Sequence, residues 1–203
     1  ERVMKLEGYA LYPHQVTGVE FLARRGRAIL GDDMGLGKTR QAIIALKESA
    51  PSGVFLIICP ASLKLNWARE ILLVDPDARI EVLGVSGYEH SQPQWVIVNY
   101  DLLARNADRL RKVAWTGVAL DEAHFIKNKT SQRSQHVLQL SERIRARTPR
   151  PLLMALFPVT ELNADDVASS VGALSELPLD AVSVGLRWYV PAGKGAEYER
   201  VMN

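Results

Sequence analysis

Runs of consecutive apolar residues alternate along this chain with stretches in which apolar positions recur at helical spacing. Residues 54–59 (VFLIIC) form an unbroken apolar run between a glycine and a proline, which is typical of a strand buried on both faces. Residues 62–72 place Leu63, Trp67 and Ile71 on one helical stripe. The same reasoning predicts further strands at 27–30, 80–83, 95–98, 118–120 and 152–156, and further helices at 39–47, 102–110 and 131–144.

This alternation of strands and helices predicts an α/β fold in which a mainly parallel sheet is covered by helices on both faces. The expected architecture is therefore a three-layer α/β/α domain. In open parallel sheets, ligands bind at the carboxyl ends of the strands. We accordingly expect the chemistry directly after residues 30, 59, 98 and 120.

Composition narrows the class of protein. The chain has 203 residues, of which 47% are hydrophobic and 24% charged, enough to bury a core. No apolar run reaches the roughly 18 residues of a membrane span, so no membrane association is expected. The single cysteine, Cys59, excludes a disulfide framework and fits a reducing compartment. The net charge of +2 permits an anionic partner, and a start at Glu1 suggests a piece of a longer protein.

A glycine-rich segment, GDDMGLGKT, follows the first predicted strand and precedes a helix. Backbone N–H groups of such a loop form a nest for phosphate, with Lys38 reaching the β- and γ-phosphates and the Thr39 hydroxyl placed to bind Mg²⁺. Asp32 stands where the strict P-loop pattern has glycine. A plain turn with a solvated lysine is the alternative, which the flanking strand and helix disfavour. The predicted nucleotide-binding residues of this loop are Asp32, Met34, Gly35, Leu36, Gly37, Lys38 and Thr39.

Two adjacent carboxylates, Asp121 and Glu122, end the predicted strand at 118–120. An acidic residue at a strand end beside a P-loop holds Mg²⁺, so Thr39 and Asp121 are the predicted metal ligands. Glu122 can polarise the attacking water. The alternative is a pair of helix-capping carboxylates. We therefore predict ATP and Mg²⁺ as cofactors, with Lys38, Asp121 and Glu122 in the catalytic role.

Five segments occur in an order that resembles a known family: LYPHQ, DDMGLGKT, IICPASLKLNWAREI, VIVNYDLL and LDEAHFIKNKTSQRS. Together they are similar to the first RecA-like lobe of the Swi/Snf family of DNA translocases, within the helicase-like ATPases. The sequence GRAILGDDMGLGKT most resembles that of the annealing-helicase branch of this family. Asp32 is then the family's own variant of the loop. We expect this lobe, a RecA-like P-loop domain, to occupy residues 1–158.

The resemblance implies roles for residues outside the phosphate loop. Gln15 would contact the adenine, with Tyr12 or His14 nearby. His124, at the end of the acidic motif, would couple the nucleotide to neighbouring parts of the motor. The alternative for His124 is a hydrogen-bonded structural histidine.

The resemblance also implies contacts with the DNA backbone, from Pro60, Ala61 and Ser62 in one turn and from Asn99 and Tyr100 in another, and we expect Lys64 to join the first of these turns. From the residues alone, Ser62 is equally a good N-cap for the helix that follows. Both roles are compatible, because a helix N-terminus attracts phosphate. Lys64 opposes the dipole in that first turn, which makes more sense if an anion approaches.

The chain departs from the family after the acidic motif. Where family members have Thr-Gly-Thr-Pro, this chain has LLMALFP, with Ala155, Leu156 and Phe157 in place of the small polar triplet. Residues 159–203 are expected to form an irregular appendage resembling the lead-in to a missing second lobe. The apolar run at 181–190 would then lack a partner strand, which makes self-association through the tail possible.

The preferred function is therefore the ATP- and DNA-binding first lobe of an ATP-dependent double-stranded DNA translocase. It would work with a second RecA-like lobe in cis, in the cytoplasm or nucleoid, or in the nucleus of a eukaryote. One alternative is a nucleotide-binding or scaffold module without motor activity, which the altered triplet favours. Another alternative is a lobe of a strand-separating DNA or RNA helicase, which the sequences of the motifs disfavour.

Overall fold

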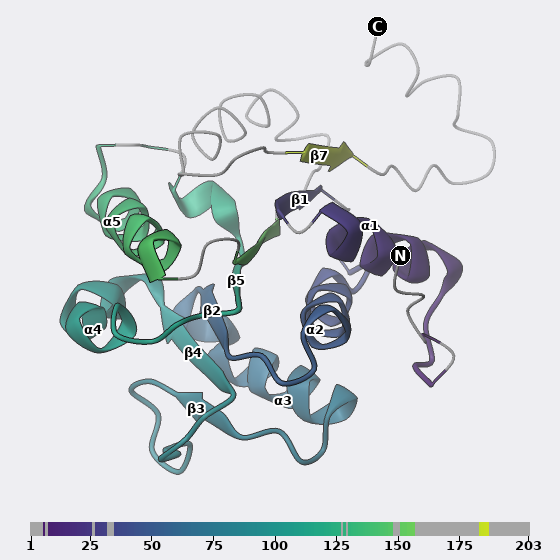
Figure 1. Ribbon diagram of the computed structural model, residues 1–203, viewed down its shortest axis with the longest axis horizontal. Coiled ribbons are helices and arrows are strands. Elements are labelled where there is room, and N and C mark those ends of the chain that lie inside the picture. Colours follow the sequence, from purple (N-terminus) through teal and green to yellow (C-terminus); the bar gives the residue numbers. More distant parts are fainter. Residues whose placement is uncertain are drawn as a thin grey trace, which may run out of the picture.

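The computed structural model describes residues 6, 8–25, 27–31, 35–126, 128, 130–147, 151–156 and 183–186 (Figure 1). Its sheet has the strand order β3-β4-β2-β5-β6-β1-β7, and every neighbouring pair is parallel. The strands are β1 Arg27–Gly31, β2 Phe55–Cys59, β3 Ile80–Val82, β4 Trp95–Asn99, β5 Gly117–Leu120, β6 Leu152–Leu156 and β7 Ser183–Leu186. The predicted parallel sheet is confirmed.

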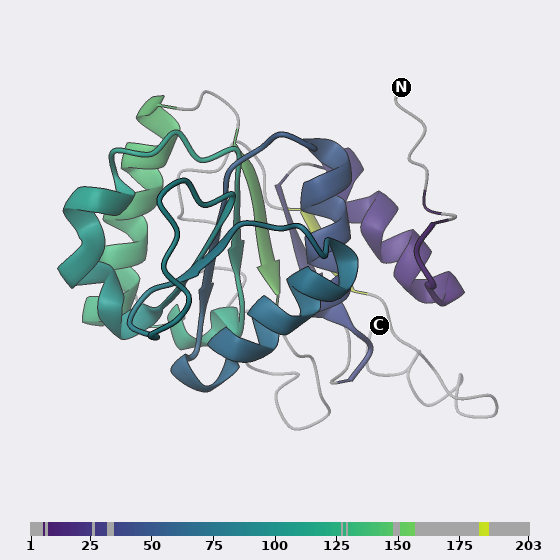
Figure 2. The ribbon, with the colours of Figure 1, turned by 90° about the horizontal axis from the view of Figure 1, so that it is seen from below.

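Helices cover both faces of this sheet (Figure 2). Helices α1, α2 and α3 lie on one face, and α4 and α5 lie on the other. The predicted three-layer α/β/α fold is therefore confirmed. The helices are α1 Pro13–Arg25, α2 Lys38–Ser49, α3 Lys64–Val74, α4 Leu103–Leu110 and α5 Gln132–Arg147, with short 3₁₀ turns η1 Ala61–Leu63, η2 Tyr100–Leu102 and η3 Ala123–Ile126.

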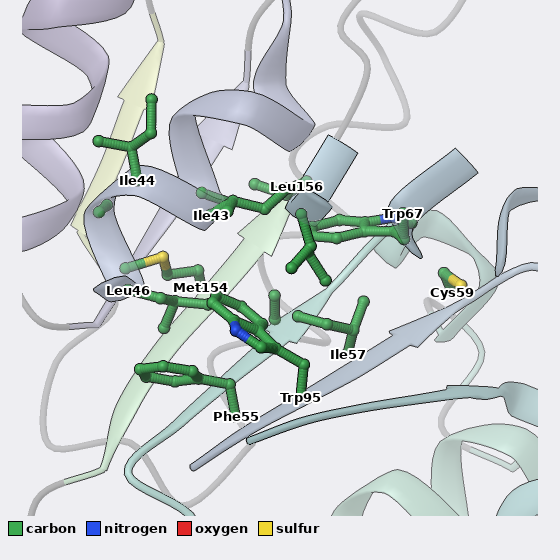
Figure 3. Packing of buried hydrophobic residues seen from close by; sticks show 14 of the residues in the cluster. Ile43, Ile44, Leu46, Phe55, Ile57, Cys59, Trp67, Trp95, Met154 and Leu156 are labelled. Carbon is green, nitrogen blue, oxygen red and sulfur yellow. The ribbon is translucent and has the colours of Figure 1, made fainter. Parts of the chain in front are cut away.

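Two apolar clusters hold the layers together, one on each face of the sheet. Every residue of β2 is buried, as the unbroken apolar run predicted, and alternate side chains enter opposite clusters. On the face of α2 and α3, Phe55 and Ile57 pack with Ile43, Trp67 and Trp95 (Figure 3). Each such side chain contributes about 1.5–3 kcal/mol on burial, so this sheet is a rigid base for the loops at its edge.

Helix α1 was not predicted from the sequence. It buries only Gln15, Gly18, Val19 and Leu22, so its apolar stripe is short. Gly18 lies at the contact with α2, in a position where an added Cβ would lie 1.7 Å from Gln41 Oε1. The close approach of the two helices therefore depends on a residue without a side chain, which a hydrophobic pattern does not report.

Helix α3 begins at Lys64 rather than at Ser62, and neither Leu63 nor Pro60 makes a side-chain cap. The chain first passes through the turn η1, in which Leu63 N donates to the Pro60 carbonyl at 3.0 Å. Ser62 is exposed within this turn. The predicted N-cap at Ser62 is therefore wrong, because a 3₁₀ bond takes the place of the side-chain cap.

The tail of the chain contributes one strand to the sheet. Residues Ser183–Leu186 form β7, which pairs with β1 in the register Ala28 with Ser183 to Gly31 with Leu186. The expectation that the run at 181–190 lacks a partner is therefore wrong at these four positions. The other residues of 159–203, together with Phe157 and Pro158, lie outside the described residues. In the part of the chain that is described, no helix is both long and apolar enough to cross a bilayer.

Candidate nucleotide-binding site

A pocket of about 390 Å³ lies where β1 and β5 end, at the carboxyl edge of the sheet. It brings together most of the residues predicted from the two motifs. Its lining comprises Gly35, Gly37, Lys38, Thr39, Arg40, Leu63, Asn66, Glu70, Asp121 and Glu122. Asp32 and Met34 lie outside the described residues.

The phosphate loop ends at Gly37, and α2 starts at the next residue, Lys38. Gly37 has φ 74°, in the left-handed region, and an added Cβ would lie 2.4 Å from Gln15 Nε2. Glycine is therefore required twice at this position, for its backbone angle and for room. The consequence is that Lys38 and Thr39 stand in the first turn of α2, where N–H groups without helical partners attract anions.

The carbonyl of Leu36 is the point at which α1 and α2 contact the loop. Gln15 Nε2 and Gln41 Nε2 lie 3.3 and 3.1 Å from this oxygen, and His14 Nε2 lies 3.4 Å from it. Gln15 Oε1 accepts from the Tyr12 N–H at 3.1 Å, and the rings of Tyr12 and His14 stack with centroids 5.8 Å apart. The structure thus brings Gln15 to the phosphate loop, while its contact with adenine stays a prediction.

Hydrogen bonds to the side chain and backbone of Asp121 hold the acidic motif at the end of β5. Asp121 has a relative exposure of 7%; its Oδ2 accepts from Trp67 Nε1 at 2.7 Å and its Oδ1 from the Glu122 N–H at 2.9 Å. The Tyr100 hydroxyl donates to the Asp121 carbonyl at 2.8 Å. Side chain and backbone of Asp121 are therefore both fixed before any ligand arrives.

Glu122 has an unusual environment for a carboxylate. Its φ of 52° makes it the one non-glycine residue with positive φ among those described, a strained angle that favours a functional role. Burial raises its pKa, the neighbouring charge of Asp121 raises it further, and Lys38 lowers it. Such a group suits general base chemistry, because a raised pKa makes the carboxylate a better proton acceptor.

The oxygen donors of this pocket suit Mg²⁺. Thr39 supplies a hydroxyl and Asp121 a carboxylate, both hard ligands. Among the described residues, no three His, Cys, Asp or Glu side chains form a group that could hold a metal by themselves. Mg²⁺ is commonly held by one or two protein ligands together with water and substrate phosphates, so Thr39 and Asp121 would be enough beside a bound nucleotide.

Helix α3 forms a wall of the pocket that sequence reasoning missed. Asn66 and Glu70 lie one turn apart and line the pocket with Leu63 of η1. Arg40, in the first turn of α2, lines it as well. The spacing of Asn66 and Glu70 on one face of α3 is visible in the sequence, but no local pattern indicates that this face is turned toward the P-loop.

Three of the predicted DNA-contacting side chains lie inside the protein. Lys64 has a relative exposure of 7%, and its ammonium donates to the Leu83 carbonyl at 2.8 Å. Asn99 and Tyr100 are also buried. The expectation of a solvent-facing Lys64 is therefore wrong, because its charge is used inside the domain. Of the predicted set, Ser62 is exposed and Pro60 half-buried.

The strand that replaces Thr-Gly-Thr-Pro is apolar and buried where it is described. Ala155 and Leu156 end β6, with relative exposures of 5% and 0%. Ala155 lies between Leu120 and Ile29 in the sheet. The side chain of His124 lies outside what the structure describes, so its predicted coupling role stays open.

Comparisons with known proteins agree with this geometry. The chain is 35% identical over 154 residues to the ISWI chromatin-remodeling complex ATPase ISW1 of Saccharomyces cerevisiae. It is 34% identical over 137 residues to the SWI/SNF-related matrix-associated actin-dependent regulator of chromatin subfamily A-like protein 1 of Xenopus tropicalis. Each match covers 66% of this chain and 14% of the relative. The chain therefore spans about a seventh of the length of these relatives.

Two solved structures share the fold. The Sulfolobus solfataricus SWI2/SNF2 ATPase core in complex with dsDNA superposes with a TM-score of 0.62 at 25% identity, over 79% of this chain and 34% of that one. The Pyrococcus furiosus Hef helicase domain gives a TM-score of 0.64 at 12% identity, over 91% and 40%. The second likeness supports the fold alone.

The profile of one family, the SNF2-related domain, covers residues 14–147. This segment contains α1, the P-loop, the α3 wall and the acidic motif. It is more than half of the chain, and the resemblance to the Swi/Snf family is confirmed. The chain therefore belongs to the SNF2-related domain family of Swi/Snf ATPases.

Proposed function

We propose that this chain is the ATP- and DNA-binding first lobe of an ATP-dependent translocase that moves on double-stranded DNA, working with a second RecA-like lobe in cis. One observation supports this most directly. Lys38 and Thr39, from the P-loop, and Asp121 and Glu122, from the acidic motif, line a single pocket although more than 80 residues separate the motifs. Phosphoryl transfer needs this combination of phosphate nest, cation, metal ligands and water-polarising carboxylate.

Each residue has a distinct part in this chemistry. The Lys38 ammonium neutralises phosphate charge, and the first turn of α2 supplies N–H donors. Thr39 and Asp121 would hold Mg²⁺, which supplies charge neutralisation for the transferred phosphoryl group when bound. Glu122 orients the attacking water and accepts its proton. Leu63, in the turn η1 before α3, contributes an apolar side chain to one side of the pocket.

Titration with a fluorescent ATP analogue tests the nucleotide site. In Lys38→Ala, affinity is expected to fall by about 2–5 kcal/mol, because the phosphates lose a desolvated charge partner, whereas the fold persists. Lys47→Ala is the matched control: Lys47 lies at the other end of α2 and pairs with Asp75 at 2.9 Å. Equal affinity in wild type and a folded Lys38→Ala protein would exclude the P-loop assignment.

The DNA contact is proposed at the turn η1, where Ser62 is exposed beside half-buried Pro60. This turn follows β2 and so lies on the same sheet edge as the P-loop. A motor that steps along any sequence should contact phosphates rather than base edges. With a net charge of +2, the lobe can neutralise few phosphates, so duplex binding is expected to be weak and without sequence preference.

A substitution pair tests this surface. Ser62→Glu places a negative charge at the turn and is expected to weaken duplex binding equally on all sequences, more strongly at low salt, with log K changing by about 0.9 per phosphate contact and tenfold change in salt. Ser52→Glu is the control, because Ser52 is also exposed but lies before β2, at the opposite sheet edge. Equal effects of the two substitutions on duplex binding would contradict a DNA contact at this turn.

One observation favours a second candidate, a nucleotide-binding module without motor activity. The end of β6 carries buried Ala155 and Leu156, whereas the family has small polar residues that link the nucleotide and DNA sites. DNA stimulation of ATP hydrolysis by the full-length parent distinguishes the two. A motor is expected to respond to duplex DNA, and a module to hydrolyse at the same rate with and without it. For a motor, we propose a nuclear location in a eukaryote and a cytoplasmic or nucleoid-associated one otherwise.

A further inference from the structure

The indole of Trp67, in α3, donates a hydrogen bond to the acidic motif. Its Nε1 lies 2.7 Å from Asp121 Oδ2, and the bond is buried. We propose that Trp67 is a positioning residue that fixes the Asp121 carboxylate for Mg²⁺, so that α3 acts on the metal site without touching the metal. This inference rests on the proposed function, because it assumes that Asp121 serves a bound Mg²⁺.

The geometry fixes both oxygens of one carboxylate. Trp67, in α3, holds Oδ2, while the N–H of Glu122 holds Oδ1 at 2.9 Å. Trp67 has a relative exposure of 0% and Asp121 of 7%, so the bond to Oδ2 is shielded from bulk water, whereas the bond to Oδ1 is partly buried. Hydrogen bonds to both oxygens restrict rotation of this carboxylate about its χ2 bond. Donors of this kind orient a metal ligand, and their loss typically costs 10- to 100-fold in metal affinity or activity.

Core packing alone does not account for this bond. The described residues include two further buried tryptophans, Trp95 and Trp115, and none of the three indoles is among the residues that line the pocket. Trp115 donates to a backbone carbonyl, that of Leu110, at 2.8 Å, and the buried Nε1 of Trp95 has no hydrogen-bond partner among the described residues. This core therefore accepts an indole N–H with a neutral partner or with none. Of these three indoles, that of Trp67 donates to a carboxylate, and this carboxylate is the buried one of the acidic motif, Asp121, which lines the pocket.

Helix α3 also contributes side chains to the wall of the pocket. Asn66, directly before Trp67, and Glu70, three residues after it, line the cavity. A movement of α3 would therefore change the pocket wall and the Trp67–Asp121 bond together. Phenylalanine at position 67 keeps an aromatic ring in the core but removes the donor, which makes Trp67→Phe the informative change.

The test compares Trp67→Phe with Trp115→Phe in the full 203-residue chain. Affinity for a fluorescent ATP analogue is measured over a range of Mg²⁺ concentrations and in excess EDTA. For Trp67→Phe, the Mg²⁺ concentration for half-maximal enhancement is expected to rise 10- to 100-fold, with unchanged affinity in EDTA. Trp115→Phe is expected to leave both quantities unchanged. A folded Trp67→Phe protein with the wild-type Mg²⁺ requirement overturns the proposal, as does an equal loss of affinity with and without Mg²⁺.

A double-mutant cycle separates positioning from general damage. In an Asp121→Asn background, Trp67→Phe is expected to cause no further change in Mg²⁺ requirement, because the ligand that it positions has gone. Additive effects contradict the proposal. If Trp67→Phe does not fold, the indole ¹H–¹⁵N signals of the unmodified chain decide: Mg²⁺ added with ADP should shift the Trp67 signal and not the Trp115 signal. A wild-type chain whose nucleotide affinity ignores Mg²⁺ overturns the proposed function itself.

Discussion

Two carboxylates stand side by side at the end of β5, one of them buried and the other half-buried. Asp121 is stabilised by Trp67 and by the next backbone N–H, whereas Glu122 has a positive φ and a pKa raised first by burial and then by Asp121. A pair of this kind costs stability, because like charges in a partly dry site repel each other. We infer that Glu122 is retained for its chemistry rather than for the fold.

Replacing Glu122 by glutamine is expected to stabilise the ligand-free protein at neutral pH. The folded-state pKa of Glu122 is raised, so wild-type stability is highest below the ordinary glutamate pKa, near 4.3, and falls as pH rises through the folded-state value. Glutamine has no charge to desolvate. The stabilisation of the glutamine variant relative to wild type should therefore appear above the folded-state pKa and vanish below the ordinary glutamate pKa. Urea unfolding at pH 4 and pH 8 measures this, with exposed Glu142→Gln as control; an equal advantage at both pH values contradicts the electrostatic account.

At the scale of elements, the packing at the centre of the sheet depends on how closely β5 and α2 approach each other. An added Cβ at Gly117, the first residue of β5, would lie 2.5 Å from Leu46 Cδ2 and 3.2 Å from the Phe55 ring. Leu46 and Phe55 both have a relative exposure of 0%, so neither can move out into solvent. The base of the strand that presents Asp121 is thus packed without spare room.

Gly117→Ala is expected to destabilise the domain by about 1–3 kcal/mol, the usual effect of overpacking a filled core. Gly8→Ala is the matched control, because nothing lies within 4 Å of an added Cβ there and its φ is not in the left-handed region. Urea midpoints of the two variants provide the comparison. A Gly117→Ala protein as stable as Gly8→Ala would mean that the sheet centre can expand, contrary to the packing described.

The elements that could be predicted from sequence are those with long or unbroken apolar patterns. Strand β2 is the clearest case, because each of its five residues is buried. Helix α1 was not predicted, since its buried apolar stripe is short and Gly18 occupies part of its contact with α2. The start of α3 was misplaced for a similar reason: Ser62 has the residue type of a cap, but backbone bonding in η1 decides the boundary.

At the scale of the whole molecule, the parallel sheet explains which part of the site was predictable. Lys38 and Asp121 could be assigned to one pocket from sequence, because the carboxyl ends of parallel strands meet at one edge. The partners of these residues come from elsewhere in the chain. The bond from Trp67 to Asp121 joins residues 54 positions apart, and the burial of Lys64 depends on the Leu83 carbonyl. No local pattern encodes such tertiary contacts.

The last prediction concerns turnover by the isolated chain. It is expected to bind Mg·ATP but to hydrolyse it slowly, because charge on the transferred phosphoryl group is normally stabilised by an arginine finger, which contributes about 10³–10⁵ in rate. Among the described residues, Arg40 is the only arginine that lines the pocket, and it lies in the first turn of α2, directly after the P-loop. A finger supplied by a second lobe would instead approach from outside this domain.

Single-turnover hydrolysis, with and without duplex DNA, measures the rate, and Arg40→Ala tests the residue already present. Fast hydrolysis that collapses in Arg40→Ala would place the stabilising charge within this lobe; slow hydrolysis unaffected by the substitution supports a division of labour between two lobes.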